Sequence, residues 1–212
     1  MLAHYSFSQK IIFALIGGIV LLSIKGFNDP VLKRNLIMSP YLIRSNKQYY
    51  RLLTSGFIHA DYLHLIFNMY VLYAFSIPLI TFFESSYFYN QFGLLYFFLL
   101  FFLGIIAAII PSYFKHQHNH AYASLGASGG VSSIVFAYII ILPTAEMGLL
   151  FIPLRLPATL FGGLYLVFSY YRAKNQLDNI NHDAHFWGGI FGIVFMLVTA
   201  LDSIKLFWSQ LF

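Results

Sequence analysis

The stretch Leu125-Gly126-Ala127-Ser128-Gly129-Gly130 opens an apolar segment that is long enough to cross a bilayer. Fifty-seven residues after Ser128, a second such segment opens with Ala184-His185-Phe186-Trp187-Gly188. A hydroxyl and an imidazole therefore each stand at the start of a membrane-length run. Polar side chains inside a membrane are costly, so their presence there indicates a function.

The composition places the chain among polytopic membrane proteins. Of its 212 residues, 59% are hydrophobic and 9% are charged, whereas a soluble domain carries about 25% charged residues. The mean hydropathy is +0.74. Cysteine is absent, which excludes disulfides and thiolate metal sites. The formal net charge of +5 is spread over segment ends without a basic block, which argues against nucleic acid as a partner.

Six segments each supply about twenty mostly apolar residues, the length needed to cross a bilayer. Continuous apolar runs, rather than alternating ten-residue strands, predict helices. The sequence therefore predicts an all-α bundle, with one membrane domain over residues 1–212 and a polar interfacial segment at 28–56. We expect the first segment to be a retained helix, because no small-residue cleavage site follows it. The predicted spans are 6–27, 59–83, 91–113, 126–142, 157–171 and 183–204.

Polar side chains from three of these segments should converge on one membrane face. Successive spans alternate in direction, so the second, fourth and sixth start at the same face. His64 and Asn68 lie early in the second span, while Ser128 and His185 open the fourth and the sixth. Residues from separate parts of the chain are thus expected at one depth on one side.

The chemistry of these groups is complementary. A serine hydroxyl becomes a nucleophile when a base such as histidine accepts its proton. Asn68 lies one helical turn after His64, so both side chains can donate hydrogen bonds to a developing oxyanion. The free N–H groups at the start of the Ser128 helix can do the same. Asp183 lies on another side of its helix from His185, so a Ser128–His185 dyad is predicted rather than a triad.

Glycines surround both predicted catalytic residues. Gly126 and Gly129 leave room for a tight turn and for a closely approaching substrate backbone. Gly188 and Gly192 form a small-xxx-small pair, the pattern that lets two membrane helices approach closely. That face of the sixth segment should bring His185 within reach of Ser128.

These motifs, in this order, resemble those of the rhomboid family of intramembrane serine proteases. The resemblance covers residues 50 to 192, and the ordered set is far more specific than any one motif. The corresponding residues are Gly126, Ser128 and Gly129 for glycine-x-serine-glycine; Ala184, His185 and Gly188, followed by Gly192, for alanine-histidine-x-x-glycine; His64 and Asn68 for the spaced pair; His59 for the upstream histidine; and Tyr50-Arg51 for the aromatic-arginine pair.

The resemblance implies an endopeptidase that cuts transmembrane proteins at helix-destabilising segments. Ser128 would be the nucleophile and His185 the base, with His64, Asn68 and the Ser128 N–H stabilising the oxyanion. No cofactor and no metal are implied, and the expected partners are protein substrates and membrane lipids. We expect His59 and Arg51 to be structural. The residues do not indicate the substrate, the pathway or the oligomeric state.

Three positions depart from the family pattern. Rhomboid proteases usually carry an aromatic residue four after the nucleophile, packed on the catalytic histidine, and here that position is Ser132. We expect Ser132 to face the sixth segment opposite its glycines, and another ring, such as Phe186 or one from a different helix, to hold the histidine. The glycine and glutamate common later in the second helix appear as Ser76 and Ile80.

Other functions fit the sequence less well. An inactive rhomboid-like protein that binds membrane clients would typically lack the serine or the histidine, and this chain keeps both. A channel or transporter would spread its polar residues along a path through the bilayer. The histidines at 116, 118 and 120 could hold a metal together with His182, but surface histidines in a loop are more common.

Two arguments about orientation disagree. The face that holds the predicted site carries nine Lys and Arg residues and the opposite face carries three, which by the positive-inside rule puts the site on the cytoplasmic side. The rhomboid resemblance implies the outer side of a cell membrane, with cytoplasmic termini. We follow the resemblance, because the first loop is long and can lie in the interface.

Overall fold

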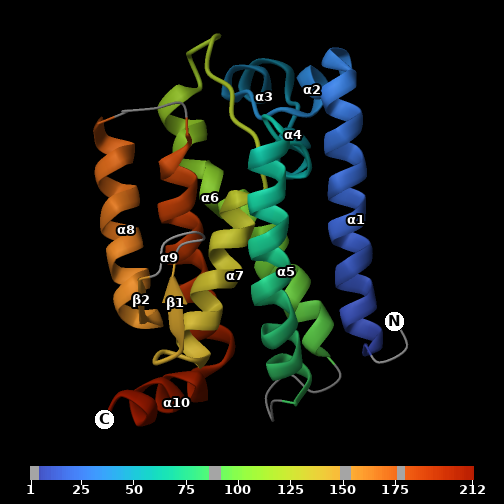
Figure 1. Cartoon of the computed structure of the whole chain (residues 1–212). Coiled ribbons are helices and arrows are strands. Elements are labelled where there is room, and N and C mark those ends of the chain that lie inside the picture. The colour runs from blue at the N-terminus through green and yellow to red at the C-terminus, as the bar shows by residue number, and fades with distance from the viewer. Residues whose placement is uncertain (1–4, 86–91, 149–153, 176–179) are drawn as a thin grey trace.

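Long helices run alternately up and down through the structure (Figure 1). The computed structural model describes residues 5–85, 92–148, 154–175 and 180–212. A mainly helical fold is therefore confirmed, with a helix at each of the six expected positions. These are α1 (Phe7–Asn28), α5 (Tyr62–Ser85), α6 (Gly93–His116), α7 (Ser128–Ile141), α8 (Ala158–Asn175) and α9 (His182–Thr199).

The segment between α1 and α5 folds into short helices on one end of the bundle. They are α2 (Pro30–Leu36), α3 (Pro40–Asn46), α4 (Arg51–Thr54) and the 3-10 turn η2 (Ser55–Phe57). Asp29 and Ser39 cap α2 and α3 through their side chains, and each helix starts with a proline, which suits a first turn. The predicted interfacial segment is thus a chain of defined turns.

The count of six spans is not confirmed. Within the described residues, α1, α5 and α6 are the helices long and apolar enough to cross a membrane by themselves. The α7 helix has 14 residues and starts well below the top of α5 and α9 (Figure 1). The α8 helix is less apolar, because it contains glycine, serine and tyrosine and ends with Arg172 and Lys174.

The predicted sixth span to residue 204 is too long. The α9 helix ends at Thr199, and α10 (Leu201–Leu211) leaves it at an angle of 111°. In Figure 1, α10 lies across the bottom of the bundle. The break occurs at Ala200, which is the C-cap of α9 and the N-cap of α10. The apolar run ends here, because Asp202 and Ser203 follow, but the sequence did not indicate the angle of the turn.

The fold is also not purely helical. Between α7 and α8, the strands β1 (Glu146–Gly148) and β2 (Arg155–Pro157) pair in antiparallel fashion. Arg155 lies 3.8 Å from Glu146 at this exposed hairpin. Both residues lie between the predicted spans 126–142 and 157–171, where no strand was predicted.

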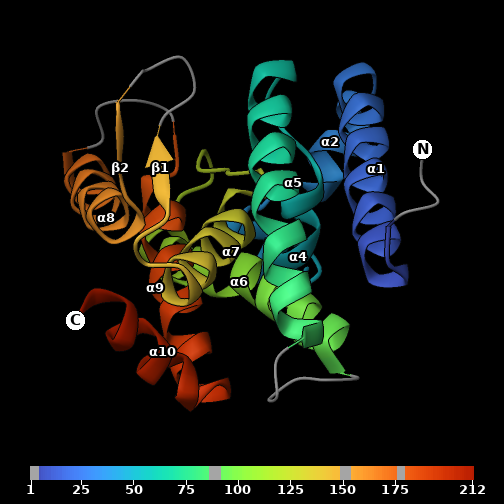
Figure 2. The same ribbon diagram turned by 60° about the horizontal axis from the view of Figure 1, so that its bottom comes forward.

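The α7 helix lies in the middle of the bundle. Figure 2 shows α5 and α9 on its two sides, with α1 and α8 at the outer edges. Eleven of its fourteen residues are buried, which explains why this short helix is apolar on every face. Ser76 and Ile80, the two departures in α5, are fully buried. The central helix carries Ser128 at its start.

Candidate active site

Ser128 is the first residue of α7, and the turn before it depends on Gly126. Gly126 has a φ of +114°, which side chains rarely adopt. A Cβ atom there would lie 2.7 Å from Cε1 of His64. The Gly126 N–H donates to the carbonyl of Ser55 at 2.9 Å. The glycine is therefore required both by the turn and by the ring of His64.

The loop before Ser128 is held by the short helices of the first connecting segment. Met38 and Ser124 exchange two backbone hydrogen bonds, of 3.0 and 3.1 Å. Together with the bond from Gly126 to Ser55, they fix both ends of the stretch 124–126. The interfacial segment thus positions the loop that carries the predicted nucleophile.

His59 connects this loop to α1. The Ala127 N–H donates to Nε2 of His59 at 3.4 Å, and Nδ1 lies 2.9 Å from the hydroxyl of Ser23. That hydroxyl donates to the carbonyl of Phe57, so Nδ1 carries the proton of a neutral imidazole. His59 is 1% exposed, and burial, helped by the nearby His64, lowers its pKa to about 3.

His64 lies at the start of α5 with its ring against Gly126. The Ala60 N–H approaches Nδ1 of His64 at 3.5 Å, which favours the tautomer with a proton on Nε2. This Nε2 lies close to Gly126, because a Cβ atom on Gly126 would be 2.8 Å from it. An N–H donor is therefore available two residues before Ser128.

Asn68 is buried one turn further along α5. One of its amide N–H groups donates to the carbonyl of His64 at 2.9 Å. An amide nitrogen has two protons, so a second donor remains for another acceptor. The predicted pair His64 and Asn68 is thus on one helix face.

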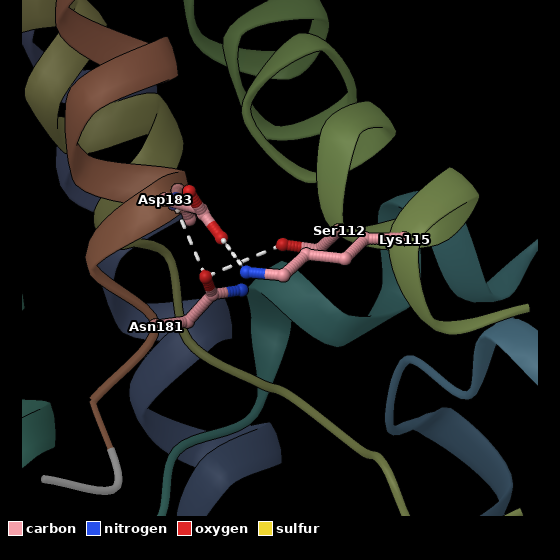
Figure 3. Close-up of polar contacts among 5 residues, drawn as sticks. Ser112, Lys115, Asn181 and Asp183 are labelled. Atoms are coloured by element: carbon pink, nitrogen blue, oxygen red, sulfur yellow. Dashed lines mark hydrogen bonds and ion pairs between the residues drawn. The ribbon is translucent and has the colours of Figure 1, made fainter. Parts of the chain in front are cut away.

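His185 lies in the first turn of α9, and this turn is tied to the end of α6. Figure 3 shows Lys115 reaching Asp183, with 3.5 Å between Nζ and Oδ2. The Ser112 hydroxyl and the Ala184 N–H both donate to Oδ1 of Asn181, at 3.4 and 3.2 Å. Asp183 of α9 therefore pairs with a lysine of α6.

The starts of α7 and α9 lie side by side. A Cβ atom on Gly188 would overlap the backbone of Gly129, and one on Gly192 would overlap that of Ser133. The Ser133 hydroxyl donates to the carbonyls of Gly129 and Gly188, at 3.0 and 2.9 Å.

A small cavity of about 10 Å³ lies at this junction, which is room for about one water molecule. Ser128 and Gly126 line it from the α7 side, and Asn181 and Ala184 line it from the α9 side. Ser128 and the residue before His185 therefore border the same space.

The expectation that a ring from a different helix meets His185 is confirmed, although the sequence did not indicate which ring it is. Tyr165 of α8 stacks on His185, with 6.2 Å between ring centroids and 14° between ring planes. The phenol interacts with the side chain of Ser132. The expectation that Ser132 faces the glycines of α9 is wrong, because Ser133 takes that place.

The loop histidines lie against different neighbours. His116 stacks on Tyr122, and His120 lies over Tyr41. His118 lies beside the guanidinium of Arg44. Among the described residues, no group of three or more His, Asp or Glu side chains could hold a metal ion.

Comparison with known proteins places these residues within one matched region. A family model described as the Rhomboid domain matches residues 46–201. The chain is also similar to presenilin-associated rhomboid-like protein A, mitochondrial, of Danio rerio, with 28% identity over 149 residues. That match covers 66% of this chain and 34% of the relative. The matched part is thus about a third of the relative's length.

Proposed function

Because the chain belongs to the rhomboid family, we propose that it is an intramembrane serine endopeptidase with a Ser128–His185 dyad. Its apolar helices and its family indicate an integral membrane protein. One observation carries the proposal. Gly188, one turn after His185 on α9, touches the backbone of Gly129, the residue after Ser128 on α7. A nucleophile and a base on such a rigid contact can work as a pair.

The reaction begins with a proton transfer. His185 accepts the proton of Ser128 Oγ as this oxygen attacks the scissile carbonyl carbon. The tetrahedral intermediate then collapses, the C–N bond breaks, and the imidazolium gives its proton to the leaving amine. A water molecule, activated in turn by His185, hydrolyses the acyl-enzyme and returns Ser128 to its resting state.

The intermediate places a negative charge on the former carbonyl oxygen. Three donors could stabilise this charge: the N–H of Ser128, which has no partner within its own helix in the first turn, and the side chains of His64 and Asn68. The His64 ring contact with Gly126 supports this assignment. The Ala127 N–H already donates to His59 and is therefore not a fourth donor to the oxyanion.

The proposed substrates are transmembrane proteins whose helices unwind near the site. We keep the outer side of a cell membrane as the proposed location of the site, with cytoplasmic termini. The relative's name gives a mitochondrial location for that protein, and this location is not part of the proposal. A reporter fused to the C-terminus tests this, and an extracytoplasmic C-terminus would refute it.

A fluorophosphonate probe tests the central claim, because it reacts with an activated serine. The purified protein in detergent should be labelled and should cleave a model transmembrane substrate. Ser128→Ala and His185→Ala should each reduce both readouts to background. Ser209→Ala, which removes an exposed hydroxyl on α10, is the matched control and should behave like wild type.

Retained cleavage in Ser128→Ala would end the serine-protease proposal. A folded wild-type protein that is neither labelled nor active would instead support the second interpretation, a rhomboid-like protein that binds membrane clients without cutting them. Both outcomes are read from the same gel.

A further inference from the structure

We infer, on the basis of the proposed function, that Tyr165 of α8 is the positioning residue for His185. The ring that the family pattern leads one to expect at position 132 of α7 is supplied here from another helix. The inference concerns the orientation of the imidazole, and Tyr165 itself touches no reacting atom.

The geometry of the two rings is that of an offset stack. Their centroids are 6.2 Å apart and their planes differ by 14°, which lies within the range of favourable ring pairs. His182 also meets His185, at 5.6 Å, but at an angle of 75°. The Tyr165 ring therefore lies beside the imidazole and nearly parallel to it, while the His182 ring lies nearly perpendicular to it.

The phenol ring is itself held in place. Phe136 of α7 lies 6.1 Å from it and Phe161 lies 6.5 Å from it, both measured between centroids. The α8 helix can approach α7 because a Cβ atom on Gly162 would lie 2.7 Å from Cδ1 of Ile139. Tyr165 is thus fixed by rings from two helices.

Ser132 makes room for this arrangement. It lies one turn after Ser128 and is 5% exposed. The phenol of Tyr165 interacts with the side chain of Ser132. A large ring at position 132 would overlap the Tyr165 ring. The small side chain of Ser132 on α7 therefore leaves the room that Tyr165 of α8 occupies.

The consequence concerns catalysis. The half-buried imidazole of His185 can rotate about its side-chain torsions unless a neighbour restricts it. Holding the ring parallel to Tyr165 restricts that rotation, so that the imidazole keeps one orientation for proton transfer with Ser128. Loss of the stacking ring should lower the turnover number and leave substrate binding nearly unchanged.

The test uses five variants of the full chain in detergent, assayed for cleavage and for fluorophosphonate labelling. Tyr165→Ala should lower kcat about tenfold, with KM within about twofold of wild type. Tyr165→Phe keeps the ring and should retain kcat within about twofold. Tyr170→Ala is the matched control: it removes an α8 ring that packs on Phe186 rather than on His185, and kcat should not change.

A relocated ring gives the sharpest outcome. Ser132→Tyr alone should lower kcat, because two rings then overpack one site. Combined with Tyr165→Ala, it should recover at least half of the loss in log kcat. A role of Tyr165 in general packing would not predict recovery by a ring on another helix.

Wild-type kcat in Tyr165→Ala would overturn the inference. So would a Tyr165→Phe variant as slow as Tyr165→Ala, since the hydroxyl and not the ring would then matter. If Tyr165→Ala fails to fold, the Phe variant and the double variant decide. These failures differ from failure of the proposed function, in which the wild type is neither labelled nor active.

Discussion

A Cβ atom on Gly188 would overlap the carbonyl oxygen of Gly129, so α9 and α7 meet backbone to backbone directly after Ser128. Close helix contacts of this kind depend on small residues. At this contact the two helices cannot approach each other more closely. Gly129 and Gly188 thereby set how near the start of α7 lies to the start of α9.

Gly188→Ala should push α9 away from α7. Overpacking of a buried contact costs about 1–3 kcal/mol, so the variant should melt at a lower temperature than wild type. Cleavage should fall by more than the loss of folded protein explains, because the two helix starts separate. Thermal unfolding in detergent and specific activity measure both effects.

Gly163→Ala is the control for this change, since a Cβ atom at Gly163 would meet nothing within 4 Å. Alanine is a better helix former than glycine by about 0.8–1.0 kcal/mol, so stability should be equal or higher. Equal melting temperatures for Gly188→Ala and wild type would contradict the close-packing account.

Much of the bundle could be predicted from the sequence because membrane helices leave long apolar runs. The starts of α5, α7 and α9 lie within a few residues of the predicted positions. The spacing of Gly188 and Gly192 also predicted a close helix contact, and Gly129 and Ser133 lie opposite them. Local patterns carry this information.

The rest depended on tertiary contacts. Asp202, Ser203 and Lys205 follow Ala200, so the sequence marks the end of the apolar run but not the sharp angle between α9 and α10. Tyr165 stands in a segment of ordinary membrane composition, and only the fold shows that it meets His185. A buried phenol needs a polar partner. The hydroxyl of Tyr165 in an apolar segment was therefore the one feature of the sequence that indicated a specific contact at this position.

The oxyanion donors can be separated from structural residues by mutation. His64→Ala should lower the cleavage rate by about 10²–10³ if its Nε2–H is a dominant donor. Asn68→Ala should lower it less if the donors are redundant, and it also removes the bond to the His64 carbonyl. Melting temperatures should change little. A large stability loss with unchanged specific activity would mark both residues as structural.

The neutral state of His59 predicts a pH dependence of stability. Its pKa is about 3 in the folded protein and should return to the ordinary value of about 6.5 on unfolding. Below pH 6.5 the unfolded chain binds a proton that the folded chain does not. The stabilisation is therefore complete above pH 6.5 and is lost as the pH falls toward 3, by up to about 1.4 kcal/mol per pH unit.

Reversible unfolding in detergent at several pH values between 7.5 and 4.5 measures this slope. His59→Gln cannot be protonated in this range, so its unfolding free energy should depend less on pH than that of wild type. The absolute stability of the variant should also be lower, because Ser23 and Ala127 lose a fitted partner. Identical pH slopes for the two proteins would disprove the assignment.

Arg51 should prove structural through its contacts with the end of α2. It is 3% exposed, and its NH1 donates to the carbonyls of Arg34 and Ile37 at 2.8 and 2.7 Å. Its Nε donates to Gln48 at 2.6 Å. Carbonyls at a helix end have no partner within the helix, so the guanidinium satisfies groups that would otherwise be costly to bury.

Arg51→Ala should lower stability by about 1–3 kcal/mol for the polar groups left unpaired. Arg51→Lys should recover only part of this, because an ammonium does not reproduce the planar fork that reaches several acceptors. Activity should fall together with stability. Arg51 holds the carbonyl of Ile37, and the next residue, Met38, is hydrogen-bonded to Ser124 in the loop before Ser128. Arg44→Ala removes an exposed arginine nearby and should stay within about 0.5 kcal/mol of wild type. A full loss of activity in a normally stable Arg51→Lys variant would instead place Arg51 in the catalytic machinery.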